Sequence, residues 1–407
     1  MPWKETCVED EKLGFIAAYL DGGEPMTALC ASFGISRDTG YRMVERYRSE
    51  GVAGLVPRSR APHRPAWAMT QAVVEAIIAL RRTRPHWGPK KLRAVLKREN
   101  VAASWPAAST IGDLLRRKGL SEPRRRRRLA VPTSQPFQPV ISPNDLWCID
   151  FKGWFRTGDG QRCDPLTLTD AYSRLILDCR VVAPTFAGSS PVVERAMREH
   201  GLPRAIRSDN GPPFASTGAG GLTQLSVHWV KLGIRLERIA PGAPQQNGRH
   251  ERMHGTLKGE TASPPAATLA DQQACFDAFR DDFNQNPPHE ALGQDVPGNH
   301  YHPSPRPYPE RIEEPIYAAD QAVRRVRCNG SIKWQGEHIF VGEALSGEPV
   351  GIAETEAGDW RVCFANIELG IIDRRTKKLR RFAAGRSPRR EARPEQTKKT
   401  VRHVSGL

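Results

Sequence analysis

The sequence predicts a multidomain α+β protein, with tandem helix-turn-helix modules first, a central α/β core built on a mixed sheet next, and a small β-barrel last. Three observations predict this fold class. Residues 10–120 carry apolar side chains at helical spacing. Residues 145–295 begin with three strand-like runs and continue with alternating helices and strands, which is typical of a mixed sheet. Residues 312–372 hold short β-like runs separated by glycine-containing turns.

Positive charge gathers at the two ends of the chain. The 407 residues are enough for two to four domains and carry a net charge of +16. Residues 1–130 contribute +12 and residues 371–407 contribute +10, so the middle is mildly acidic at −6. This distribution favours a carboxylate-bearing catalytic body between two arms that bind the phosphates of nucleic acid. The alternative is that the basic ends serve solubility alone.

Composition disfavours several other classes of protein. The apolar runs are only a handful of residues long, so the sequence predicts no membrane span, and its first residues do not resemble a signal peptide. The eight cysteines are widely scattered without a Cys-x-x-Cys pair, which argues against zinc knuckles and a disulfide framework. The cytoplasm, which is reducing, is therefore the expected location.

The first predicted domain, residues 1–56, consists of three helices. Apolar side chains recur at helical spacing over residues 13–20, Gly34 closes a short second helix, and Ser36 caps a third. This is the layout of a helix-turn-helix module that binds DNA, although any small three-helix domain has the same pattern. The residues predicted to contact DNA from the third helix are Arg37, Arg42 and Arg46.

Two basic linkers flank a second helical module. Residues 57–69 are expected to follow a DNA groove, and residues 70–122 to form a winged or helix-turn-helix-like DNA-binding domain. Residues 123–143 are rich in arginine and proline, and their arginine run either grips phosphates or is only a solvated or localising tail. The arginines predicted to contact DNA here are Arg58, Arg60, Arg64, Arg116, Arg117, Arg124, Arg125 and Arg126.

The predicted core, residues 144–300, starts with an apolar strand at 146–151 that is interrupted by one carboxylate, Asp150. The further strands are expected at 166–169, 175–177, 204–208 and 234–239, and the helices at 191–200, at 221–232, from 247 onward and at 268–285. After a proline-rich stretch, the β-barrel is predicted over residues 312–373 and a basic tail over residues 374–407.

Three carboxylates stand where metal-dependent chemistry is expected. Asp150 lies inside an apolar strand, where a buried charge is costly unless it is paired or binds a metal. Asp209 follows a later strand, although an Asx turn with Asn210 also explains an aspartate there. Glu251 lies in a helix, where it is either functional or simply exposed. Together they offer the hard oxygen ligands that Mg²⁺ or Mn²⁺ prefers.

These residues lie in three linked motifs: Trp147-x-x-Asp150; Arg207-Ser208-Asp209-Asn210-Gly211; and Pro244-Gln245-Gln246-Asn247-Gly248-x-x-Glu251-Arg252, followed by Leu257-Lys258. In order and context they resemble the catalytic core shared by retroviral integrases and bacterial insertion-sequence transposases of the DDE type. The resemblance covers residues 145–295 closely, and the flanking modules extend it to most of the chain. It implies a ribonuclease-H-like core over residues 144–300.

The resemblance also implies an activity. A transposase of this kind binds the terminal inverted repeats of its own insertion sequence, cleaves to free 3′-hydroxyl ends and joins them to target DNA. It implies that Asp150, Asp209 and Glu251 are the catalytic residues and the ligands of two Mg²⁺ ions, or of Mn²⁺ in their place. The expected partners are double-stranded DNA and further copies of the chain in a synaptic complex, with no membrane and no small-molecule substrate. The expected location is the bacterial cytoplasm, at the nucleoid.

Further DNA contacts are expected near the glutamate, from Asn247, Arg252 and Lys258. His250 and His254 are expected to face solvent or DNA rather than a metal, whereas Trp147 is assigned to the core. Three other acids are interpreted as turn or strand-edge residues: Asp164, Asp170 and Asp178.

The sequence departs from the family pattern in two places. Asp209 and Glu251 are 42 positions apart, wider than the roughly 35 residues usual in the family. The glycine-rich stretch at residues 218–221 explains the difference as a loop insertion that leaves the site intact. Pro287 also stands before Pro288-His289, where the family usually has arginine.

Two other functions stay open on the sequence alone. One is a DNA-binding regulator with a catalytically inactive core, and the other is a ribonuclease-H-like nuclease. The intact set of three carboxylates argues against the first. The two DNA-binding modules argue against the second, because a general nuclease has no need to recognise particular DNA ends.

Overall fold

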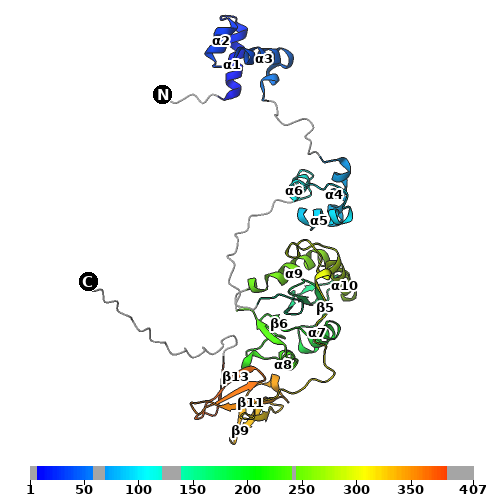
Figure 1. Ribbon diagram of the computed structural model, residues 1–407, viewed down its shortest axis with the longest axis vertical. Helices are drawn as coiled ribbons and strands as arrows, with labels where there is room; N and C mark the ends of the chain where they lie inside the picture. Colours follow the sequence, from blue (N-terminus) through cyan, green and yellow to red (C-terminus); the bar gives the residue numbers. More distant parts are fainter. Residues whose placement is uncertain (1–6, 58–68, 122–138, 241–243, 383–407) are drawn as a thin grey trace, which may run out of the picture. The chain divides into compact units, whose positions relative to one another are not determined.

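The computed structural model describes residues 7–57, 69–121, 139–240 and 244–382. The chain divides into two compact units, Met1–Thr70 and Gln71–Leu407 (Figure 1). Among the described helices, none combines the length and the apolar character that a membrane span requires.

The first unit is a three-helix module, as predicted. Its elements are α1 (Val8–Asp21), α2 (Met26–Ser32), α3 (Arg37–Glu50) and the 3₁₀ turn η1 (Gly51–Leu55). The side chain of Ser36 caps α3 by accepting a hydrogen bond from the amide of Thr39. At Gly40 an added Cβ would lie only 2.5 Å from Sγ of Cys30, so the glycine permits α3 to pack closely on α2. Phe15 and Val44 are buried in the core between the helices.

The second helical module opens the other unit. It consists of α4 (Gln71–Thr83), α5 (Pro89–Glu99) and α6 (Ala108–Arg117). One residue from each helix, Ile77, Leu92 and Ile111, is fully buried, as the helical spacing of apolar residues predicted. The guanidinium of Arg81 donates to the carbonyl oxygens of Leu120 and Trp87 and so ties α4 to the segments that follow α4 and α6.

The core contains a five-stranded mixed sheet in the order β5-β4-β1-β6-β7. Its strands are β1 (Trp147–Phe151), β4 (Pro165–Asp170), β5 (Ile176–Val181), β6 (Ala205–Ser208) and β7 (Arg235–Arg238). The three strands on one side pair antiparallel, whereas β1, β6 and β7 run parallel, which confirms the predicted mixed sheet. A short hairpin of β2 (Phe155–Arg156) and β3 (Arg162–Cys163) lies between β1 and β4 in the chain.

Helices cover both faces of this sheet (Figure 1). On one face α7 (Phe186–His200) and α8 (Gln224–Lys231) bury apolar residues against Ile149 and its neighbours. On the other face α9 (Gly248–Thr261) and α10 (Leu269–Gln285) pack on β5. Because side chains alternate along a strand, Ile149 points toward α7 and α8 and Asp150 points toward α9.

The carboxyl-terminal module holds a second five-stranded sheet, in the order β14-β13-β12-β11-β8, and a separate hairpin. The sheet strands are β8 (Ala322–Arg325), β11 (Pro349–Glu354), β12 (Trp360–Phe364), β13 (Ile367–Ile372) and β14 (Leu379–Arg381); the hairpin strands are β9 (Ser331–Trp334) and β10 (Glu337–Phe340). In the described part of the chain no strand pairing closes the sheet, so the predicted barrel is not confirmed. The last strand lies within the stretch predicted as a tail.

The glycine-rich stretch at residues 218–221 has a structural role that the sequence did not suggest. It forms a 3₁₀ turn, η2 (Ala219–Gly221), which packs against β13 of the carboxyl-terminal module. The guanidinium of Arg238 donates to the carbonyl oxygens of Gly220 and Gly221 and holds the turn against β7. This turn therefore attaches the second sheet to the core.

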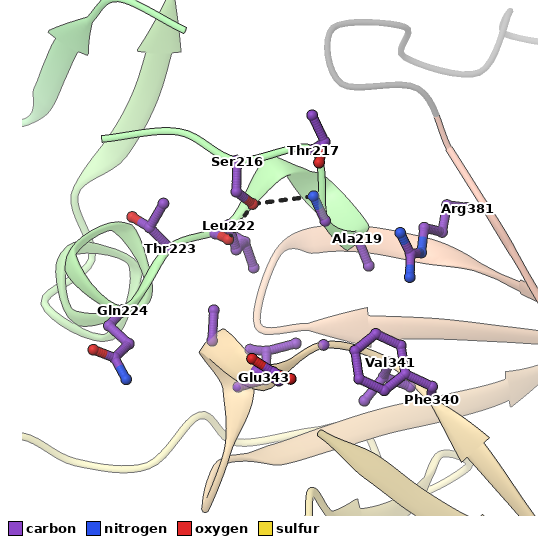
Figure 2. Close-up of a pocket in the computed structure, with 14 residues that line it drawn as sticks. Ser216, Thr217, Ala219, Leu222, Thr223, Gln224, Phe340, Val341, Glu343 and Arg381 are labelled. Carbon is purple, nitrogen blue, oxygen red and sulfur yellow. Dashed lines mark hydrogen bonds between the residues drawn. The ribbon is translucent and has the colours of Figure 1, made fainter. Parts of the chain in front are cut away.

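A pocket of about 390 Å³ lies beside this attachment. Residues around Ser216 and Thr223 of the core line one side, and residues around Val341 and Arg381 line the other (Figure 2). The hydroxyl of Ser216 closes the turn by donating to the carbonyl oxygen of Leu222 and accepting from the amide of Gly218.

Substituting the glycine at the centre of η2 tests the attachment. Gly220 has a φ of 62°, and an added Cβ would lie 3.0 Å from Cγ2 of Ile367. We expect Gly220→Ala to lower the free energy of unfolding by about 2–4 kcal/mol, from backbone strain and overpacking together. Gly293→Ala is the matched control, because φ there is 65° and nothing lies within 4 Å of the added atom. Equal losses in urea unfolding would mean that the contact with Ile367 contributes nothing.

Candidate active site

Asp150 is the best-defined carboxylate of the candidate site. It lies on β1, at the centre of the sheet, with 23% of its side chain exposed. Burial raises the pKa of Asp150 to about 7, and the negative charges of Asp209 and Glu251 add to this increase. The electrostatics therefore couple the three carboxylates that the sequence predicted to work together.

The parallel ladder between β1 and β6 aligns the two aspartates. Trp147 pairs with Ile206 and Cys148 with Arg207. Continuing the same offset along both strands brings Asp150 level with Asp209. Burial raises the pKa of Asp209, whose Oδ1 accepts a hydrogen bond from the amide of Gly211, so the Asx turn that the sequence offered as an alternative is present. The turn and a role in the site are compatible, because Oδ2 is left for other partners.

Glu251 occupies the first turn of α9 and is exposed. Its neighbours on the opposite side of the helix, Met253 and Leu257, pack into the core beneath. Within the described residues, the group whose possible ligand atoms all lie within 4.8 Å of one another is Asp150, His250 and His254. Asp209 and Glu251 act on Asp150 through their charges but are not members of that closest group.

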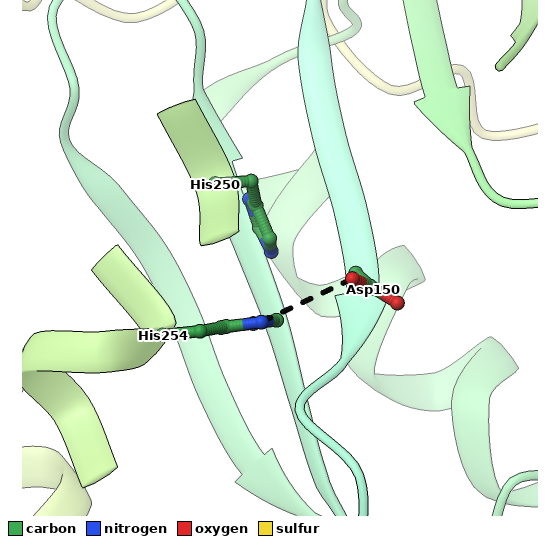
Figure 3. Close-up of side chains that lie close together, drawn as sticks. All are labelled: Asp150, His250 and His254. Carbon is green, nitrogen blue, oxygen red and sulfur yellow. Dashed lines mark ion pairs between the residues drawn. The ribbon is translucent and has the colours of Figure 1, made fainter. Parts of the chain in front are cut away.

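The two histidines are buried, contrary to the expectation that they face solvent or DNA. His250 is 2% exposed and His254 is 5% exposed. Both point from α9 toward the sheet, and Nδ1 of His254 lies 3.9 Å from Oδ2 of Asp150 (Figure 3). Burial lowers the pKa of His250 to about 3 and that of His254 to about 2, so both rings are neutral near pH 7.

Two threonines of β4 hold these rings. Oγ1 of Thr167 lies 2.7 Å from Nε2 of His250, 2.7 Å from Nε2 of His254 and 3.1 Å from the carbonyl oxygen of Asp150. Oγ1 of Thr169 lies 2.8 Å from Nδ1 of His250. The sequence carried a signal for this arrangement, because Thr167 and Thr169 alternate with leucines in a buried strand and the histidines share one helix face.

The chain entering α9 is fixed by a buried ion pair. Arg207 on β6 donates to Glu237 on the neighbouring β7 at 2.9 Å, and both side chains are less than 10% exposed. Arg207 also donates to the carbonyl oxygen of Gln246, just before the helix. Asn247, predicted to contact DNA, is itself only 5% exposed, so its side chain faces the protein interior.

The described arginines of the helical modules differ in exposure. Arg37 is exposed, Arg42 is exposed but pairs with Asp38, and Arg46 is only partly exposed because it donates to the carbonyl oxygen of Val56. Arg116 and Arg117 are exposed on α6. The predicted contacts that lie outside the described residues are Arg58, Arg60, Arg64, Arg124, Arg125 and Arg126.

Arg252 and Lys258 are exposed on α9, the helix that carries Glu251. Their positions leave both positively charged side chains accessible to a DNA phosphate backbone that approaches the carboxylates of the site.

The three acids interpreted as turn or strand-edge residues all have partners in the structure. Asp164 pairs with Arg162 at the edge of the core, and Asp178 pairs with Arg180. Asp170 ends β4 and accepts hydrogen bonds from the amide and hydroxyl of Ser173. Trp147 is fully buried and belongs to the core.

Pro287, which replaces the usual arginine of the family, is buried at the end of α10. Nearby, the side chain of Asn284 makes hydrogen bonds to the amide and the carbonyl of Ile176 and so fixes the end of the helix to β5. This segment therefore anchors α10 to the sheet.

Comparison with known families divides the chain in the same way as the structure does. A helix-turn-helix domain family matches residues 11–63, and a homeodomain-like domain family matches residues 39–115. The integrase core domain family matches residues 232–297, which include Glu251. The carboxyl-terminal domain of IS481 family transposases matches residues 321–380.

A curated relative decides the family. The 31.7 kDa protein of insertion element IS407 from Burkholderia multivorans is 30% identical over 232 residues, which span 56% of this chain and 79% of the relative. The chain belongs to the insertion-sequence transposase family. A 39.2 kDa protein of insertion element IS476 from Xanthomonas euvesicatoria is 29% identical over 60% of this transposase and 69% of its own length. The Gag-Pol polyprotein of baboon endogenous virus is 37% identical over 67 residues, 16% of the transposase and 4% of the polyprotein.

Solved structures also resemble this transposase. The magnesium complex of the HTLV-2 integrase catalytic core domain is 17% identical with a TM-score of 0.32, over 40% of this chain and 99% of that one. A simian T-cell lymphotropic virus intasome chain is 17% identical with a TM-score of 0.35, over 70% of this chain and 91% of that one. The mixed sheet covered by helices on both faces is the ribonuclease-H-like core implied by the sequence motifs, and the chain is a DNA-binding enzyme of the transposase and integrase class.

Proposed function

We propose that this transposase binds the terminal inverted repeats of its own element, cleaves the DNA there and joins the freed 3′-hydroxyl ends to target DNA. Asp150, Asp209 and Glu251 are its catalytic residues. One observation carries the proposal: burial raises the pKa of Asp150, on a strand, to about 7, and the negative charges of Asp209, at a strand end, and Glu251, on a helix, add to this increase. Such mutual repulsion is relieved when a divalent cation binds between the carboxylates.

The donor set fits Mg²⁺ or Mn²⁺, because both prefer carboxylate oxygens. Bound in a pair, these ions stabilise the charge that develops on a phosphodiester and activate the attacking hydroxyl. The chain itself supplies the ligands and their alignment. The ladder between β1 and β6 fixes Asp150 relative to Asp209, and the pairing of Arg207 with Glu237 fixes the start of the helix that carries Glu251.

The positively charged side chains around the site bind and orient the DNA. Arg252 and Lys258 are exposed on the same helix as Glu251, and phosphate contacts from such side chains set the position of a duplex without reading its sequence. The helix-turn-helix modules supply the sequence recognition, through residues such as Arg37 and Arg117. Joining two ends at one target requires two bound ends, so we propose that the active form is a homo-oligomer assembled on DNA at the nucleoid.

A cleavage assay with the full chain tests this function. Labelled duplexes that carry the flanking ends of the element are incubated with unlabelled target DNA, with Mg²⁺, with Mn²⁺ or with a chelator. We expect cation-dependent nicks that expose 3′-hydroxyls at the ends, followed by their transfer to the target, and no reaction with the chelator. Binding without cleavage in either metal would identify a DNA-binding regulator, and nicking at random positions would identify a nuclease.

A further inference from the structure

The hydroxyl of Thr167 determines which nitrogen of each histidine carries the proton. A threonine hydroxyl has one proton to donate, and a carbonyl oxygen only accepts. In the structure the hydroxyl of Thr167 donates this proton to the carbonyl oxygen of Asp150, at 3.1 Å. Nε2 of His250 and Nε2 of His254, each 2.7 Å from the same hydroxyl oxygen, must both be donors.

The other ring nitrogens are then unprotonated in the neutral imidazoles. Nδ1 of His250 accepts a hydrogen bond from the hydroxyl of Thr169 at 2.8 Å, so both nitrogens of that ring are occupied. Among the residues that the structure describes, Nδ1 of His254 has no such donor: it faces Oδ2 of Asp150 at 3.9 Å, too far for a hydrogen bond. Two lone-pair-bearing atoms thus face each other across a gap inside the protein (Figure 3).

We propose that Nδ1 of His254 is a nitrogen ligand, together with the carboxylate of Asp150, for one of the divalent cations of the active site. The separation fits, because bonds of about 2.0–2.2 Å from each ligand reach a common ion when the ligand atoms are less than about 4.2 Å apart. A metal-binding histidine normally donates its second N–H to a neighbouring group that fixes the ring, and Thr167 is that group here. His250 keeps Thr167 in place and is not itself a ligand.

This assignment rests on the proposed function of Asp150 as a metal ligand, and it adds a consequence for metal choice. Imidazole nitrogen suits the transition metals, whereas Mg²⁺ is bound through oxygen. A site with His254 therefore favours Mn²⁺ over Mg²⁺ more strongly than a site made of carboxylates alone. Replacing His254 by asparagine, whose amide offers an oxygen of similar reach, should shift the preference back toward Mg²⁺.

Pulsed electron paramagnetic resonance of the full chain loaded with Mn²⁺ alone tests this directly. We expect echo modulation from a directly bound ¹⁴N nucleus, with the ¹⁵N pattern in its place when the chain is made with ¹⁵N-histidine. We expect His254→Asn to lose the modulation and to weaken Mn²⁺ binding by about tenfold or more. His302→Asn, at an exposed histidine away from the site, is the matched control and should keep both.

The outcomes separate this inference from the function on which it rests. Mn²⁺ that binds in an Asp150-dependent manner without nitrogen modulation overturns the role of His254 and leaves the carboxylate site standing. Nitrogen modulation that persists in His254→Asn also overturns the role of His254. Metal-dependent DNA cleavage by a chain that binds no Mn²⁺ overturns that role as well. Absence of both metal binding and cleavage overturns the inference and the proposed function together. The spectrum of the unaltered chain remains decisive even if the variant does not fold.

Discussion

We expect Asp209→Asn to abolish DNA cleavage and joining, by about three orders of magnitude or more, and to leave binding to the element ends within a few-fold of the unaltered chain. The substitution removes one negative ligand and part of the repulsion that raises the pKa of Asp150. It keeps the local backbone, because an asparagine Oδ1 can still accept the hydrogen bond from the amide of Gly211. The expected loss is therefore one of metal binding rather than of folding.

Three measurements on the same preparation check this expectation: end binding, single-strand nicking and strand joining. Asp164→Asn is the matched control, because that carboxylate pairs with Arg162 at the edge of the core and has no part in the site. The control should retain both activities. A variant at Asp209 that binds DNA poorly but still nicks it would contradict the assignment of Asp209 as a ligand.

Glu237→Ala should lower the free energy of unfolding by about 3–5 kcal/mol, because it leaves the guanidinium of Arg207 buried without this carboxylate. The pair spans β6 and β7 with both side chains less than 10% exposed, so water cannot readily replace the lost partner. Cleavage should fall as well, since Arg207 also holds the carbonyl oxygen of Gln246 at the entrance to α9.

Urea unfolding followed through the tryptophan fluorescence of the chain, to which the buried Trp147 and Trp229 of the core contribute, measures this loss. Glu314→Ala is a suitable control because its pair with Arg325 is more than half exposed on both sides, and such solvent-exposed pairs contribute little to stability. If the two variants lost the same amount of stability, Arg207 and Glu237 would not form the stabilising contact described above.

The sequence predicted the parts of the site that depend on local pattern. A carboxylate inside the apolar run of β1 identified Asp150, because burial of a charge there requires an explanation. The mixed sheet followed from the order of strands and helices. The three-helix modules followed from helical spacing and from the cap at Ser36.

The remainder depends on contacts between residues far apart in the chain. His250 and His254 are buried because they meet Thr167, more than 80 positions earlier, and no local pattern gives that pairing. The turn at Gly220 packs against Ile367 of a different module, so its attachment role was equally hidden. The barrel prediction correctly placed most of the strands but did not capture how they pair, which the pattern of short strands does not specify.

The shared register of β1 and β6 restricts where this chain can change in length. Side chains alternate between the two faces of a sheet, so one residue inserted within β1 before Asp150 would turn that aspartate toward α7 and α8 and away from α9. Extra residues are acceptable only in the connecting turns, because the number of residues in a turn does not change which face of the sheet each strand residue points to. Engineered insertions between positions 151 and 205 therefore belong in those turns and never inside the paired segments.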